Sequence, residues 1–141
     1  MAASTPQPLS DEIVALSTYI AEAAARPLPA EVARKTRLHL LDTLGAIVSG
    51  TQLPAGRLGA RFAASTGGVE EALAVGARAL LPTAQAAFAN AMAAHGDETD
   101  DSHLAGRCHP GCAIVPAALA VAEREDAGGD ALLRAIALGY D

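Results

Sequence analysis

Aromatic residues are scarce in this chain, and tryptophan is absent altogether. Aromatic residues make up 3% of the 141 residues, although hydrophobic residues make up 51% and charged residues 18%. This composition supports a buried core and argues against disorder. Because that core must consist of small and branched aliphatic side chains, closely approaching helices suit it better than a β-sandwich does. The length is typical of one small domain.

The chain also lacks a basic stripe, a long apolar run and a leader sequence. Ten Lys and Arg residues against sixteen Asp and Glu residues give a net charge of -6, and the basic residues form no run that would follow a phosphate backbone. No nucleic-acid partner is therefore expected. No apolar run approaches the roughly 18 residues that span a bilayer, and the first 25 residues carry acids but no Lys or Arg. We expect a soluble, cytoplasmic protein with no membrane partner.

Cysteine is nearly absent. The two cysteines, Cys108 and Cys112, lie on either side of His109, Pro110 and Gly111. Two thiols are too few for an ordinary four-cysteine iron–sulfur cluster, and nothing in the sequence indicates an oxidising compartment. We expect both cysteines to be free thiols that serve as small packing residues.

Apolar residues recur at helical spacing between Pro, Gly and capping residues, which predicts six helices. We expect these helices at about residues 11–25, 29–49, 54–64, 82–95, 113–123 and 130–138. Residues 72–75, just before Gly76, have the composition of one short strand. Residues 1–9 form a Pro-containing N-terminus that we expect to be disordered. The predicted fold is an all-α, Ala-rich helical bundle over residues 10–141.

One segment does not fit this apolar scaffold. The sequence HGDETDDSHLAGRCH, residues 95–109, contains four carboxylates and three imidazoles. These are Asp97, Glu98, Asp100, Asp101, His95, His103 and His109. Acids and histidines at this density perturb one another's protonation, and a scaffold of mostly Ala, Leu, Val and Gly has no structural use for them. We expect the functional site in this loop.

Three segments together carry a resemblance to a known family. They are HLLDTLGAIVSG at residues 39–50, AAFANAMAAHGDETDDSH at 86–103 and HPGCAIVPAALAVAE at 109–123. In order and spacing they resemble the amino-terminal third of the MmgE/PrpD family, over roughly residues 10–141. That family includes 2-methylcitrate dehydratase, cis-aconitate decarboxylase and iminodisuccinate epimerase.

The resemblance implies a metal-independent, cofactor-free enzyme that is much longer than this chain. It implies a large all-helical domain, a smaller α/β lid, an active site between the two, and usually a homodimer. The chain would supply only the first part of the helical domain, because further active-site lysine and histidine residues and the whole lid lie beyond it. We therefore expect the chain to be inactive alone and to act as a homodimer or with a complementing chain.

The family motif can be carried over residue by residue. The motif consists of a histidine, two spacer residues, an aspartate, one spacer residue, two aspartates and a threonine. Its five named positions correspond to His95, Glu98, Asp100, Asp101 and Ser102. Its following histidine before proline corresponds to His109. Glu98 stands where the family usually has Asp, and Ser102 where it usually has Thr. Both keep the functional group, but the longer Glu side chain moves a carboxylate by about one carbon–carbon bond, which leaves the substrate open.

Such an enzyme dehydrates, decarboxylates or epimerises a small di- or tricarboxylate such as 2-methylcitrate or cis-aconitate, as in propionate metabolism. Each reaction moves a proton at a carbon next to a carboxylate, so the site needs a positioned acid or base and cations for the developing charge. His109 is the first candidate for the acid or base. We expect the carboxylates of Asp100, Asp101 or Glu98 to act on an imidazole, and for this they need not contact the substrate directly. They would orient and charge His103 or His109.

Three further residues are expected to bind substrate, namely Ser102, Arg107 and His95. Arg107 can clamp a substrate carboxylate. Structural roles compete with these: His95 at a helix end is typical of a C-cap, Ser102 can cap a turn, and Asp97 is typical of a solvated loop acid.

Two other functional classes stay open at this point. Side chains competent to hold a divalent ion, as in a hydrolase, are His95, Asp100, Asp101, His103 and His109, although their spacing matches no standard ligand pattern. Alternatively, the chain is a non-catalytic helical interaction module that associates through exposed apolar faces.

Overall fold

The computed structural model describes residues 9–23 and 25–141 of the chain. In this part the chain forms six helices and one two-stranded hairpin. The helices are α1 (Asp11–Ala23), α2 (Ala30–Gly50), α3 (Pro54–Ser65), α4 (Thr83–Ala94), α5 (Gly111–Arg124) and α6 (Gly129–Tyr140), and the strands are β1 (Ala72–Ala74) and β2 (Ala79–Leu81). The predicted helical class and the six helices are confirmed. The expected disordered N-terminus, apart from Leu9, lies outside the described residues.

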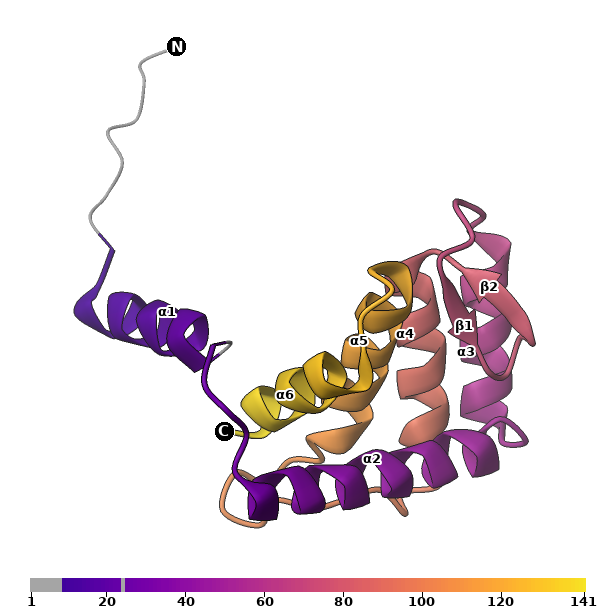
Figure 1. Cartoon of the computed structure of the whole chain (residues 1–141). Coiled ribbons are helices and arrows are strands. Elements are labelled where there is room, and N and C mark those ends of the chain that lie inside the picture. Colours follow the sequence, from indigo (N-terminus) through magenta and orange to yellow (C-terminus); the bar gives the residue numbers. More distant parts are fainter. Residues whose placement is uncertain (1–8, 24) are drawn as a thin grey trace, which may run out of the picture.

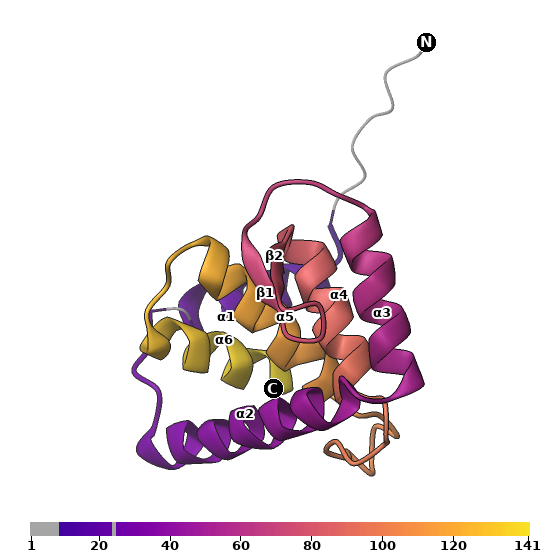
Figure 2. The same ribbon diagram turned by 90° about the vertical axis from the view of Figure 1, so that its right-hand side faces the viewer.

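Helix α4 is the centre of the bundle. It contacts α2, α3, α5 and both strands, while α6 packs against α5 and α2. Figure 1 shows α2 running along one side of the molecule, with α4, α5 and α6 lying over it and the hairpin at the far end of α4. The turned view in Figure 2 shows α3 beside α4 and the loop between α4 and α5 below them. This arrangement places both ends of that loop on packed helices.

The core consists largely of alanine, and close helix approach follows from that. Ala63, Ala86, Ala89 and Ala93 are buried on α3 and α4. A Cβ atom at Gly50, the last residue of α2, would lie 1.8 Å from the carbonyl oxygen of Ala93. Close helix approach was the expectation from the scarcity of aromatic residues, and the structure confirms it.

The hairpin extends the short strand that the sequence predicted near residues 72–75. Strand β1 pairs antiparallel with β2, in the register Ala72 with Leu81 and Ala74 with Ala79. The second strand was not expected, because three apolar residues before Pro82 give no periodic signal. Asn90 of α4 anchors the hairpin: its Nδ2 donates to the Leu73 carbonyl at 2.8 Å, and its Oδ1 accepts from the Val75 N–H at 2.9 Å.

Two helices expose apolar residues that periodicity alone would place in a core. Helix α1 has no buried residue among those described, and it lies at the edge of the bundle, where Arg134 of α6 donates to the Ala23 carbonyl (Figure 1). In α2 the buried face carries Thr36, Thr43 and Ile47, while Leu38 and Leu41 are exposed. Small side chains face the bundle here because other helices approach α2 closely. Among the described residues, no helix is both long and apolar enough to cross a membrane.

Gly50 and Gly45 of the same helix provide a matched test of the close packing. Gly50→Ala places a Cβ against backbone of α4, so we expect a loss of unfolding free energy of about 1–3 kcal/mol from overpacking. Gly45→Ala meets nothing within 4 Å, so we expect a gain of about 0.5–1 kcal/mol from lower chain entropy. Urea unfolding followed by circular dichroism measures both. Equal effects of the two substitutions would contradict the packing described here.

Candidate active site

The loop between α4 and α5 is held in shape by its own residues. His103 and Cys108 form an isolated antiparallel bridge, with the His103 N–H donating to the Cys108 carbonyl at 2.9 Å. The Nδ1 atom of His103 accepts the Gly106 N–H at 3.0 Å. This closes a tight turn at the tip of the loop. His103 therefore has a structural role in the turn.

Asp97 ties the start of the loop to α2. Its Oδ2 accepts a hydrogen bond from Ser49 Oγ at 2.9 Å, and its Oδ1 accepts one from Thr99 Oγ1 at 2.7 Å. The hydrogen bonds from Thr99, and then from Ser49, lower the pKa of this carboxyl. Asp97 is therefore an anionic residue that holds the start of the loop to α2, and it is more than a solvated acid.

Asp100 is the centre of the cluster. Its side chain is fully buried, with 0% exposure, between the imidazoles of His95 and His109. His95 Nδ1 lies 3.1 Å and 3.2 Å from the two carboxylate oxygens, and His109 Nδ1 lies 3.6 Å from Oδ1. The two rings are 5.1 Å apart between centroids. Because a buried carboxylate is costly without donors, His95 Nδ1 must carry a proton that it donates to Asp100, whereas His109 at 3.6 Å makes no hydrogen bond to this carboxylate.

His109 has one ring nitrogen committed to the protein. Its Nδ1 lies 2.7 Å from the backbone carbonyl oxygen of Asp101 and 3.5 Å from Ser102 Oγ. A carbonyl oxygen only accepts hydrogen bonds, so Nδ1 carries the proton. The neutral ring then has its lone pair on Nε2. The site consequently presents Nε2 of a half-buried imidazole as an atom that can take or give a proton.

Asp101 connects the loop to α5 and α6. Its Oδ1 accepts the Gly111 N–H at 2.9 Å, and its Oδ2 accepts the Tyr140 hydroxyl at 2.7 Å. His39 Nδ1 lies 3.6 Å from Oδ2, and the His39 ring stacks on Tyr140 with 4.4 Å between centroids. Burial, together with the bond to Asp101, raises the pKa of Tyr140, so its hydroxyl stays protonated and donates.

Sequence reasoning missed His39 and Tyr140. His39 opens the first of the three segments that carry the family resemblance, but its position there gave no sign of a contact with the loop. Tyr140 is 39 residues from Asp101 along the chain. Only the packing of α2 and α6 around α5 brings them to the cluster.

The predicted site residues divide into two groups. The structure brings together His95, Asp100, Asp101 and His109, with Ser102 at their edge. The other three, Glu98, His103 and Arg107, are exposed, and within the described residues no hydrogen bond or ion pair joins them to the cluster. Their proposed roles stay predictions.

The two cysteines differ in their exposure. Both are free, as expected, but Cys108 is exposed and so is not a core packing residue. Cys112 is partly buried on α5, where its Sγ donates to the His109 carbonyl at 3.0 Å. Burial, followed by the nearby Asp100 carboxylate, raises the pKa of this thiol to about 11. Cys112 is therefore an inert neighbour of the site.

The cluster is acidic and imidazole-rich, with no guanidinium or ammonium in contact. In the part of the chain that the structure describes, the arginine ion pairs are Arg26 with Glu22 and Arg124 with Glu125, away from the loop. Ligand-competent atoms of His95, Asp100 and His109 lie within 4.8 Å of one another. The arrangement can move protons, and its donor set is also compatible with a cation.

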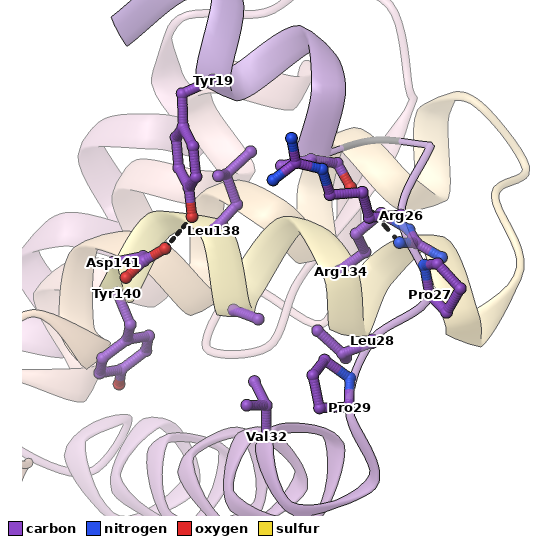
Figure 3. A pocket seen from close by; sticks show the side chains of 12 residues that line it. Tyr19, Arg26, Pro27, Leu28, Pro29, Val32, Arg134, Leu138, Tyr140 and Asp141 are labelled. Carbon is purple, nitrogen blue, oxygen red and sulfur yellow. Dashed lines mark hydrogen bonds between the residues drawn. The ribbon is translucent and has the colours of Figure 1, made fainter.

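Two hollows lie beside the cluster. One is lined by Thr36, His39, Ala137 and Tyr140, in the groove between α2 and α6. The neighbouring pocket between α1, α2 and α6 shares Tyr140 with the cluster and none of its loop residues (Figure 3). Within the cluster, the side chains of His95 and His109 are partly exposed, whereas that of Asp100 is buried.

Comparison with known proteins gives one family. The family model described as the MmgE/PrpD N-terminal domain matches residues 14–141, nearly the whole chain. No curated protein matches. No solved structure matches either.

The two cysteines give a test of the local environment. At pH 8 a thiol with a pKa of about 11 has about one part in a thousand as thiolate, the form that reacts. We expect a thiol reagent to modify exposed Cys108 quickly and Cys112 far more slowly. Mass spectrometry of digested peptides over time follows each site, and Cys108→Ser isolates the Cys112 signal. Rapid labelling of Cys112 in the folded variant would contradict the raised pKa of this thiol.

Proposed function

Because the chain belongs to the MmgE/PrpD family, whose members include lyases, we propose that it performs proton-transfer chemistry on a small polycarboxylate. The substrate is a di- or tricarboxylate such as 2-methylcitrate or cis-aconitate, and the reaction is dehydration, decarboxylation or epimerisation. The observation that carries this proposal is the fixed imidazole of His109, with Nδ1 bonded to the Asp101 carbonyl and no hydrogen bond to Nε2 from any residue that the structure describes.

His109 is the proposed acid or base. In the direction of proton removal, Nε2 takes the proton from the carbon next to a substrate carboxylate, and the electron pair of the C–H bond moves toward that carboxylate. The ring then becomes an imidazolium with N–H at both nitrogens. Buried Asp100, 3.6 Å from Nδ1, stabilises that positive charge, and Asp101 fixes the ring orientation. Asp100 therefore acts on the imidazole through its carboxylate, and Asp101 through its backbone carbonyl.

The remaining predicted residues are proposed to surround the substrate. His95, held by Asp100, and Ser102, beside His109, are proposed to contact the substrate. Glu98 and His103 as further catalytic groups, and Arg107 as a carboxylate clamp, belong to the same proposal. All three are exposed on the loop, where a bound anion can reach them.

The negative charge of the cluster indicates that cationic side chains outside it bind the substrate's carboxylates. A polyanion is repelled by Asp100 and Asp101 unless cations face it, and the described cluster contains no Lys or Arg contact. We propose that Arg107 supplies one of these cations and that a second copy of the chain, or a complementing chain of the family, supplies the others. Turnover is then expected from the assembly and not from the chain alone.

Turnover assays test the proposal. The chain alone, and the chain together with the remaining segments of a family enzyme, are incubated with 2-methylcitrate, cis-aconitate and related acids. His109→Gln should lower kcat of the assembly by at least about 100-fold, because the proton-transferring group is lost. Asp100→Asn should also lower kcat, because an amide cannot stabilise the imidazolium.

Asp130→Asn, in the first turn of α6, is the matched control for Asp100→Asn, because Asp130 is exposed. It should leave kcat unchanged. Turnover that survives both His109→Gln and Asp100→Asn would remove the assignment.

A divalent-metal site is the second candidate, favoured by the proximity of His95, Asp100 and His109. A metal ion on His109 Nδ1 would have to replace the proton that bonds the Asp101 carbonyl at 2.7 Å. We therefore expect purified chain to hold no stoichiometric metal by elemental analysis, and turnover to survive a chelator. A stoichiometric ion together with loss of turnover in the chelator would favour the metal site.

A further inference from the structure

Tyr140 is joined to the ring of His109 through a single residue, Asp101. The Tyr140 hydroxyl donates to Asp101 Oδ2 at 2.7 Å, and the backbone carbonyl of Asp101 accepts from His109 Nδ1 at the same distance. Because both bonds end on one residue, the direction of the Asp101 side chain limits where its carbonyl can point.

We propose that Tyr140 and His39 are positioning residues for His109. They hold Asp101 in the orientation that keeps the proton on Nδ1 of His109 and leaves Nε2 free. The catalytic meaning of this inference rests on the proposed function, whereas the positioning itself is a property of the chain and is measured without turnover.

Tight packing around Gly111 restricts the position of the Asp101 carboxylate. A Cβ atom at Gly111 would come within 2.8 Å of Asp101 Oδ1 and of Thr43 Oγ1, and within 2.7 Å of the Tyr140 hydroxyl. Helices α2, α5 and α6 therefore meet at this point with no room for a side chain on Gly111. The Gly111 N–H fixes one carboxylate oxygen, and Tyr140 fixes the other.

His39 holds the Tyr140 ring in turn. The two rings stack at an interplanar angle of 28°, and the side chain of His39 is only 24% exposed. In Figure 3 the Tyr140 ring extends from the end of α6 toward α2, away from Tyr19 and Asp141. Neither Tyr140 nor His39 lies on the loop, so each acts on His109 only through Asp101.

The chain contains its own control for the hydroxyl. Tyr19 also donates to a carboxylate, that of Asp141, but on the exposed α1 (Figure 3). Tyr140→Phe and Tyr19→Phe therefore remove the same atom and the same kind of bond. Only the first bond leads to His109.

The test is a long-range ¹H–¹⁵N correlation spectrum of the ¹⁵N-labelled full chain, at a pH where the imidazoles are neutral. His109→Gln identifies the His109 signal. In the natural sequence we expect His109 in the Nδ1–H form. Tyr140→Phe should shift the ratio of Nδ1–H to Nε2–H by about fivefold toward Nε2–H, the size expected for loss of one supporting hydrogen bond. Tyr19→Phe should leave the ratio unchanged.

A second variant keeps the inference testable if Tyr140→Phe does not fold, as judged by helical circular dichroism. His39→Leu retains every atom of Asp101 and Tyr140 but removes the stacked ring, and it should move the ratio in the same direction by less. An unchanged ratio in either folded variant overturns the positioning role. The His95 signal, held by Asp100 and not by Asp101, should stay constant in both variants.

The outcome separates this inference from the proposed function. In an active assembly, Tyr140→Phe should lower kcat with little change in KM, because the ring that moves protons is misdirected. A shifted ratio with unchanged kcat supports the positioning and contradicts the role of His109 in turnover. If Tyr140→Phe leaves the ratio of Nδ1–H to Nε2–H unchanged while His109→Gln is inactive, the positioning role is wrong and the proposed function stands.

Discussion

The site depends on one buried carboxylate. Asp100 has no exposed side-chain surface, and its oxygens face the imidazoles of His95 and His109. A buried anion is tolerated only where donors or positive charge compensate it, so Asp100 requires the proton of His95 to be on Nδ1. The neighbouring carbonyl of Asp101 imposes the same choice on His109. The alanine-rich bundle matters because α4 and α5 pack against each other and so hold the two ends of the loop that carries these groups.

Much of the fold could be predicted from the sequence. Pro54, Pro82 and the glycines mark helix boundaries, and these signals are local, so the helix positions agree with the structure. Strand β2 could not be predicted, because Ala79–Leu81 is too short to show a period. The outward face of α2 could not be predicted either: Leu38 and Leu41 fit a helical stripe, but tight packing selects small side chains such as Thr43 and Ala46 for the interior.

The candidate site was predictable only in part, for a related reason. The high density of acids and histidines indicates that the site lies in this loop. It does not indicate which residues of the loop come together in space. His103 bonds within its own turn, whereas His109 meets Asp100 and Asp101. Tyr140 and His39 reach Asp101 through tertiary packing, which no spacing in the sequence reveals. The family match supports the proposed class of chemistry, and the geometry supports the roles that we propose for individual atoms.

The central claim is that Nε2 of His109 moves a proton at a carbon of an anionic substrate. The most direct measurement is release of deuterium into water from a polycarboxylate labelled at the carbon next to a carboxylate, in the active assembly and its His109→Gln variant. We expect release by the natural sequence and none above background from the variant, with the labelled substrate still bound by the variant. Undiminished release from the variant would contradict it.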